Sequence, residues 1–227
     1  MKKVILITVL GLLTLAVLIG LVLFAFGGNG MNTASEPINL NGTWKILVHK
    51  NGDSSEIPAN EFAVFDDAAV SVCRDGEDNS VLTSAYVIES SESLMLSDIP
   101  RRYVMKKITE NIIMLADSKT TALYLVRWPG ESMTTPTFNA SLLQGKFKVI
   151  CHSGNTMINE ELLFAADKLD VFRDGAAEPM LTSDISVKDG VLSVDKLGSS
   201  FLCTAIGEKT IVMVDVNTGD IWEFRAE

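Results

Sequence analysis

The sequence has few of the residues on which several large classes of protein depend. It holds three cysteines and two histidines in 227 residues, and 19 basic residues against 29 acidic ones. Three cysteines are too few for a disulfide-dense scaffold. With Lys2 and Lys3 set aside, 17 basic residues face 29 acidic ones. This balance argues against nucleic acid or an anionic lipid surface as a partner, because both are bound through Lys and Arg.

Short catalytic and cofactor motifs are also missing. The sequence contains no Gly-x-Ser-x-Gly, no His-Glu-x-x-His, no phosphate loop and no dinucleotide fingerprint. The stretch 215–220 begins like a calcium loop, but its glycine is one place early and Ala226 stands where an EF-hand has Glu. We therefore expect no catalytic residue, no cofactor and no metal, although the absence of motifs does not by itself exclude an enzyme.

A long apolar run lies near the start of the sequence. From Val4 to Phe26, 19 of 23 residues are apolar and none is charged. As a helix this run is about 35 Å long, enough to cross a hydrocarbon core. We expect residues 1–26 to be a cytoplasmic stub and a transmembrane signal anchor in a cell membrane, with the remainder extracellular. The alternative is a signal peptide cleaved near residues 25–27, which would give a secreted protein.

The remainder contains an internal repeat. Residues 61–88 and 160–187 align without a gap, with 9 identities in 28, where chance gives about 2. Both copies carry Arg-Asp-Gly followed by Leu-Thr-Ser. The two copies predict two domains, 38–128 and 141–227. A small-residue linker, 27–37, precedes the first domain, and a Pro-, Gly- and Thr-rich joint, 129–140, separates the two.

Each copy has the pattern of about eight short β-strands. Trp44, Ile46 and Val48 alternate with their neighbours, and pairs such as Asp189-Gly190 are strong hairpin signals. No sustained helical period follows the apolar run. We predict an all-β protein with two tandem antiparallel up-and-down barrels, because closure removes exposed strand edges. Strands this short favour an interior filled by its own side chains.

The first copy resembles the bacterial lipocalin-like domains, which are small calycin-type β-barrels. The resemblance rests on Gly42, Thr43 and Trp44 at the start of the first strand, with Arg127 at the end of the last. In that family the tryptophan closes one end of the barrel and an arginine from the last strand packs over it. The resemblance therefore implies that Arg127 stacks on Trp44, an arrangement with a cation–π basis.

The second copy carries a weaker form of the same motif. Gly145 and Phe147 stand at the start of its first strand and Arg225 near the end of its last, so the resemblance implies a pair between Phe147 and Arg225. The motif is specific for fold and says little about cargo, because lipocalin-like barrels carry many ligands or none. Any ligand is expected at the barrel end away from Trp44 and Phe147, since those residues plug the other end.

These observations favour a membrane-anchored, surface-exposed, non-enzymatic binding protein. Its partner would be a small apolar ligand or a cell-envelope protein, and the membrane would be contacted through the helix from Val4 to Phe26. One alternative is an envelope polysaccharide hydrolase that uses paired carboxylates across a cleft. Another is a structural accessory subunit of a membrane complex. An open apolar cavity would favour ligand carriage, and a filled interior would favour a protein partner.

The cysteines are interpreted through the repeat, because each aligns with an apolar residue of the other copy. The aligned pairs are Cys73 with Phe172, Cys151 with Val48, and Cys203 with Met105. Buried, inert thiols are therefore predicted. A disulfide between Cys151 and Cys203 is the alternative, which geometry decides.

His49 and His152 fall at matching positions in the two copies. A zinc site needs three or four ligands, and the alternation that places Trp44 and Phe147 inside sends both histidines outward, so solvated side chains are predicted.

The remaining candidates for functional groups are three pairs of acidic residues and one cluster of basic residues. The acidic pairs 66–67, 77–78 and 160–161 are expected on the solvated surface, most of them in turns. The basic cluster at 101–107 marks a partner surface or protects an exposed edge strand.

Overall fold

The computed structural model describes residues 38–227, apart from 53, 58, 118–120, 131 and 208. The predicted membrane-spanning helix and the linker that follows it lie outside the described residues. Among those that are described, no helix is long and apolar enough to cross a membrane. All the described residues belong to one compact unit.

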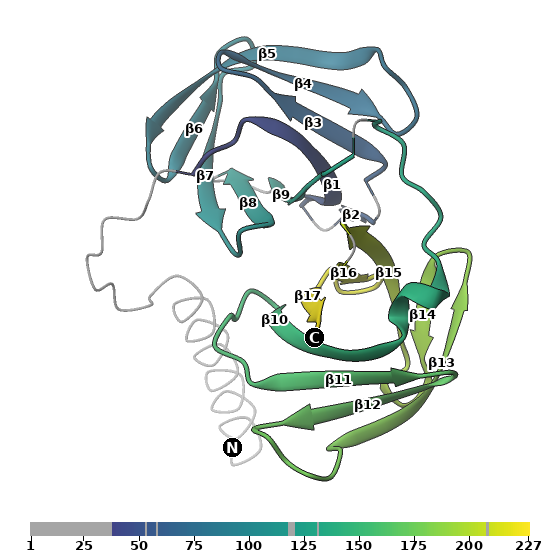
Figure 1. Ribbon diagram of the computed structural model, residues 1–227. Coiled ribbons are helices and arrows are strands. Elements are labelled where there is room, and N and C mark those ends of the chain that lie inside the picture. Colours follow the sequence, from purple (N-terminus) through teal and green to yellow (C-terminus); the bar gives the residue numbers. More distant parts are fainter. Residues whose placement is uncertain (1–37, 53, 58, 118–120, 131, 208) are drawn as a thin grey trace, which may run out of the picture. The chain divides into compact units, whose positions relative to one another are not determined.

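The first copy forms a closed antiparallel barrel of eight strands (Figure 1). Its strands are β1 (Gly42–Asn51), β3 (Glu61–Phe65), β4 (Ala69–Arg74), β5 (Ser80–Ser90), β6 (Ser93–Leu96), β7 (Arg101–Lys107), β8 (Ile112–Asp117) and β9 (Thr121–Arg127). Each strand pairs with the next, and β1 also pairs with β9, which closes the ring. A further strand, β2 (Ser54–Glu56), pairs with β1 outside the ring and was not predicted.

The second copy forms another closed barrel of eight strands. Its strands are β10 (Gly145–His152), β11 (Glu160–Ala165), β12 (Lys168–Arg173), β13 (Leu181–Lys188), β14 (Val191–Val194), β15 (Ser199–Ile206), β16 (Thr210–Asp215) and β17 (Ile221–Ala226). Pairing of β10 with β17 closes it. Two short 3-10 helices, η1 (Ala140–Leu143) and η2 (Asp195–Leu197), are the only helical elements among the described residues. The predicted all-β fold of two eight-stranded barrels is confirmed.

The turn between β13 and β14 shows how local sequence directs the strands back on themselves. These strands end at Lys188 and begin again at Val191, so only Asp189 and Gly190 connect them. Both residues have positive φ, 52° and 80°, as the tightest hairpin turn requires. The predicted hairpin is confirmed.

The interior of each barrel is occupied by its own side chains. Large buried residues of the first core are Trp44, Phe65, Met105 and Leu125, and those of the second are Phe147, Phe164, Phe201 and Phe224. Burial of this apolar surface is the main force that holds each barrel together. A ligand therefore has to use the barrel ends or the outer surface.

Both closing strands contain a β-bulge at the same place. The register of β1 against β9 shifts between Ile46 and Val48, and that of β10 against β17 shifts between Val149 and Cys151. One extra residue in a strand reverses which face the following side chains occupy. Trp44 and Ile46 thus belong to the core of the first barrel, whereas Val48 packs outside it.

The outward side chains beyond the bulge pack against the second barrel. The shared cluster contains Leu47, Val48, Ile112 and Val126 from the first barrel with Val212, Val214 and Ile221 from the second. Beside it, the buried carboxylate of Glu223 accepts hydrogen bonds from Thr109 Oγ1 and from Asn111 Nδ2 at 2.8 Å. The two barrels therefore pack against each other through a third hydrophobic cluster, separate from the two barrel interiors.

The connection between the barrels is fastened to the first one. Lys45 is 1% exposed, and its Nζ lies 3.0 Å from Asp75 Oδ2 and also bonds Thr135 Oγ1. The Thr135 amide donates to Asp75 Oδ1 at 2.9 Å, and the Gly76 amide donates to the Met133 carbonyl at 2.8 Å. Burial lowers the pKa of Lys45, while the bonded carboxylate of Asp75 acts in the opposite direction. The part of the joint around Met133 and Thr135 is thus hydrogen-bonded to the first barrel.

Replacing Glu223 with Ala should destabilise the protein. The change leaves the buried Thr109 hydroxyl and the Asn111 amide without their acceptor, and we expect a loss of about 2–4 kcal/mol in the free energy of unfolding. Urea denaturation followed by tryptophan fluorescence measures it. Glu178→Ala, in an exposed turn, is the matched control. Equal midpoints for the two variants would contradict a structural role for Glu223.

Candidate functional site

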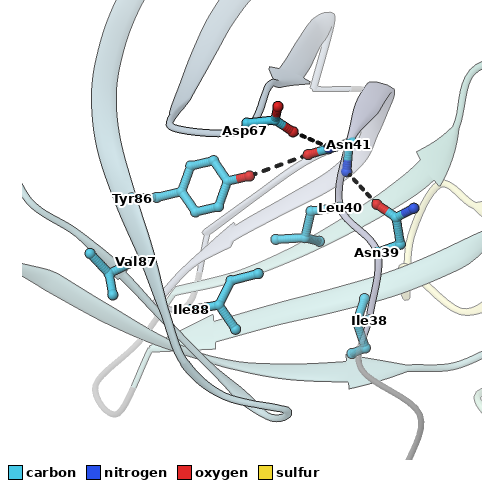
Figure 2. A pocket seen from close by; sticks show the side chains of 8 residues that line it. All are labelled: Ile38, Asn39, Leu40, Asn41, Asp67, Tyr86, Val87 and Ile88. Atoms are coloured by element: carbon cyan, nitrogen blue, oxygen red, sulfur yellow. Dashed lines mark hydrogen bonds between the residues drawn. The ribbon is translucent and has the colours of Figure 1, made fainter.

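A hollow of about 460 Å³ lies on the first barrel between β5 and the segment that precedes β1 (Figure 2). Its apolar lining residues are Ile38, Leu40, Val87 and Ile88, and its polar ones are Asn39, Asn41, Asp67 and Tyr86. Val87 and Ile88 are 49% and 45% exposed, so apolar surface in the hollow faces water. Such a mixture of apolar area and a few oriented polar groups is typical of small-molecule sites.

The polar side of the hollow is organised by hydrogen bonds. The side-chain Nδ2 of Asn41 donates to Asp67 Oδ1 at 2.6 Å, and the backbone N–H of Asn41 donates to Asn39 Oδ1 at 3.0 Å (Figure 2). The Tyr86 hydroxyl donates to the Asp66 carbonyl at 2.5 Å and lies 3.5 Å from Asn41 Oδ1. Burial raises the pKa of Tyr86, and the charges of Asp66 and Asp67 raise it further. Tyr86 therefore remains a neutral phenol at neutral pH.

Trp44 and Arg127 hold the wall of this hollow. The Arg127 guanidinium lies 4.3 Å from the centre of the Trp44 ring, directly across the β1–β9 pair. Trp44 Nε1 donates to the Leu40 carbonyl at 2.6 Å, and Arg127 donates to the carbonyls of Asn39 and Asn41 at 2.9 and 3.2 Å. These bonds fix the segment before β1 over the end of the barrel.

Gly42 lies at the turn from that segment into β1. Its φ of +113° is a conformation that residues with a side chain rarely adopt. Gly145 has a φ of +100° at the corresponding position of β10. The two glycines of the sequence motif therefore supply backbone geometry at the entry to each barrel.

Phe147 and Arg225 do not come together in the second barrel. Phe147 lies opposite Ala226, and Arg225 lies opposite Lys148, one residue away and on the other face of the sheet. Arg225 is exposed, and the Phe147 ring instead packs edge-on against two core phenylalanines. An arginine that stacks on Phe147 would have to stand at position 226, directly opposite it, as Arg127 stands opposite Trp44. Arg225, which the sequence alignment matches to Arg127, is one residue away from that position.

A smaller hollow of about 210 Å³ occupies the corresponding place on the second barrel. It is lined by Leu143, Gln144, Ala166, Ile185 and Val187 among others, which match Leu40, Asn41, Asp67, Tyr86 and Ile88 of the first. Both hollows are lined by the segment that leads into the first strand of their barrel. The expectation of a ligand at the barrel ends away from Trp44 and Phe147 stays a prediction, and neither hollow was predicted from the sequence.

The histidines point inward, contrary to the outward direction predicted from simple alternation. Residues directly opposite each other in an antiparallel pair share a face. Beyond the bulge, His49 lies opposite Leu123 and His152 opposite Trp222, and both of these partners pack against the barrel cores. The His152 and Trp222 rings stack with centroids 3.5 Å apart at 25°. The sequence gives no sign of the bulge that causes the reversal.

Glu160 is buried beside His152, so the prediction that it lies on the solvated surface is also wrong. Its side chain is 3% exposed. Oε1 accepts hydrogen bonds from the exposed Arg173, whereas Oε2 has no hydrogen-bond partner and lies 3.9 Å from His152 Nδ1. In the first barrel Glu61 lies opposite Arg74 in the same way. The identical Glu and Arg of the aligned block were the sequence signal for this pair.

The three cysteines are free and buried. Burial raises the pKa of Cys203 to about 12 and also raises that of Cys151, so both thiols are protonated and unreactive. The predicted burial of the thiols is confirmed, and the alternative disulfide is not formed. Within the described part of the chain, no group of three or more His, Cys, Asp or Glu side chains is placed to hold a metal ion.

The basic cluster on β7 is largely neutralised by acidic neighbours. Arg102 Nε lies 2.6 Å from Glu89 and Arg101 Nε 3.9 Å from Asp117. Lys107 Nζ lies 2.6 Å from Glu110. Because β7 pairs with strands on both sides, protection of an exposed edge is not its role.

Comparisons with known proteins leave the family open. The sequence matches no protein-family model and no curated protein. Among solved structures, the chain is similar to a protein of unknown function from the DUF3598 family of Nostoc punctiforme. The two sequences are 12% identical, the match covers 82% of this chain and 96% of that one, and the TM-score is 0.32.

His152 should make stability depend on pH. Its pKa is lowered, chiefly by burial, despite the opposing charges of Glu160 and Asp220. The unfolded chain therefore binds a proton more readily than the folded one as the pH falls through about 6.5, and stability is lost there. Urea unfolding at pH 8, 7, 6 and 5 should show a steeper loss for the wild type than for His152→Gln. Parallel curves would contradict this prediction.

Proposed function

We propose that this protein is a binding protein, not an enzyme, and that the hollow of the first barrel holds a small, mainly apolar molecule with one polar group. The observation that carries the proposal is the exposure of Val87 and Ile88 inside a hollow of about 460 Å³. That volume is within the range of small-molecule sites, about 300–1,000 Å³. Covering apolar surface contributes about 25 cal/mol per Å², so a ligand gains binding energy there.

The polar side of the hollow would orient the ligand. The Asn41 side chain is bonded to Asp67 and close to the Tyr86 hydroxyl, which places hydrogen-bonding groups on one side and apolar side chains on the other. A neutral head group suits the site better than an anionic one, because Asp67 would repel a negative charge. The filled barrel interior supports a ligand at the rim over one in the core.

The apolar run at residues 4–26 supports the cellular part of the proposal. As a transmembrane anchor it would keep Lys2 and Lys3 in the cytoplasm and hold both barrels outside the cell. The resemblance to lipocalin-like domains agrees with a carrier or sensor of small molecules at the cell envelope.

Calorimetry with 1-octanol tests the binding site. The full chain in lipid nanodiscs should bind this probe more than the same nanodiscs without protein. Val87→Asp should weaken binding about tenfold or more, because it removes apolar contact and places a charge in the hollow. Val104→Asp is the matched control, since Val104 is 55% exposed and lies outside the hollow. Equal binding by the two variants, or no binding by the wild type, would shift the proposal to a protein partner.

Cysteine labelling tests the orientation. The native cysteines are buried, so a membrane-impermeant maleimide should leave the wild type unlabelled in intact cells. Ala176→Cys, in an exposed turn, should be labelled without lysis. Labelling of this variant only after lysis would place the barrels inside the cell and contradict the anchor proposal.

A further inference from the structure

The end of the second barrel away from Phe147, which we call its open end, contains a group of polar residues that is separate from the apolar hollow. The Glu160 side chain is 3% exposed there, with one oxygen bonded by Arg173 and the other without a hydrogen-bond partner. The rings of His152 and Trp222 stack on each other beside Glu160, and the His152 side chain is 34% exposed. The site therefore has a buried acceptor oxygen beside a partly exposed imidazole. A buried acceptor left unpaired is costly, so a donor that satisfies it would be bound favourably.

The distance between Glu160 Oε2 and His152 Nδ1 indicates what kind of donor can bind there. Glu160 Oε2 and His152 Nδ1 are 3.9 Å apart, too far for a hydrogen bond between them. A single atom can lie about 2.8 Å from both. A neutral imidazole offers an acceptor nitrogen, so one group with several donors can bond both atoms at once. A primary ammonium has three N–H donors and meets this requirement.

The charges around the site favour the same chemistry. Asp215 on β16 lies opposite Phe201 on β15 and is 6% exposed. Burial acts to raise its pKa, but hydrogen bonds, among them those from the backbone amides of residues 217 and 218, lower the pKa overall. Asp220 acts on His152 through its charge. The charges that act on His152 are therefore those of two carboxylates, Glu160 and Asp220, and of one cation, Arg173. The Trp222 ring, with Phe201 edge-on to it at 6.5 Å, adds an aromatic surface of the kind that attracts cations.

We propose that the open end of the second barrel binds a small primary amine in its protonated form, with the ammonium between Glu160 Oε2 and His152 Nδ1 and its organic part against Trp222. This site is separate from the apolar hollow and takes a ligand of different chemistry. The protein, with its net charge of -10, attracts cations over longer distances.

The first barrel carries the same polar residues but lacks an aromatic ring opposite its histidine. His49, Glu61 and Arg74 occupy the matching positions, yet Leu123 stands opposite His49 where the second barrel has Trp222. Leucine offers no π surface to a cation. The amine site therefore belongs to the second barrel, and the first barrel shows which residue the fold accepts at position 222.

The test uses benzylamine as the probe and benzyl alcohol as its neutral match. Calorimetry on the full chain in zwitterionic lipid nanodiscs at pH 8 should show benzylamine binding and at least about tenfold weaker binding of benzyl alcohol, because a charge-assisted hydrogen bond and a cation–π contact are lost. Glu160→Gln keeps the shape of the side chain and should weaken benzylamine binding about tenfold or more.

Three controls make the result decisive. Glu161→Gln changes the adjacent carboxylate on the other face of β11 and should leave binding unchanged. Trp222→Leu copies the first barrel and should weaken benzylamine binding severalfold while leaving benzyl alcohol unaffected. Circular dichroism confirms that each variant folds. Equal affinity for amine and alcohol, or equal loss from Glu160→Gln and Glu161→Gln, would overturn the proposal, whereas octanol binding at the first barrel would be untouched by either result.

Discussion

Pairing between the first and last strands of each copy is the constraint on which the rest of the structure depends. Without the β1–β9 and β10–β17 ladders, each copy would be an open sheet with two unpaired edges, which invite aggregation. Closure with eight short strands leaves an interior that the barrel's own side chains occupy. The proposed ligand sites consequently lie outside the cores, where strand termini and connecting segments bring polar groups together.

The bulge in each closing strand lets one strand serve two surfaces. Before the bulge, Trp44 and Ile46 contribute to the core of the first barrel; immediately after it, Leu47 and Val48 contribute to the cluster between the barrels. One residue later the side chains turn inward again, which brings His152 onto Trp222. A single inserted residue per copy thus produces both the packing of the barrels and the polar constellation at the open end.

The sequence predicted the strands well because each leaves a local signal. Alternating apolar residues and Asp-Gly turns are read within a few positions, and the repeat gave two independent views of the same pattern. Long-range features left no such signal. Glu160 is buried because Arg173 lies across a strand pair, and Glu223 is buried because Thr109 and Asn111 come from the other barrel. The pairing of Trp44 with Arg127 was reached only through a family resemblance.

The closing ladders also bring the beginning and end of each copy side by side. A chain that enters and leaves a barrel at neighbouring points can have that barrel doubled by a tandem gene duplication, with a short connector and no rearrangement of its hydrogen bonds. The original copy keeps its stability while the new one diverges. The alanine that faces Phe147 and the tryptophan that faces His152 are consistent with such a history, in which two modules that fold alike have come to offer different chemistry to their surroundings.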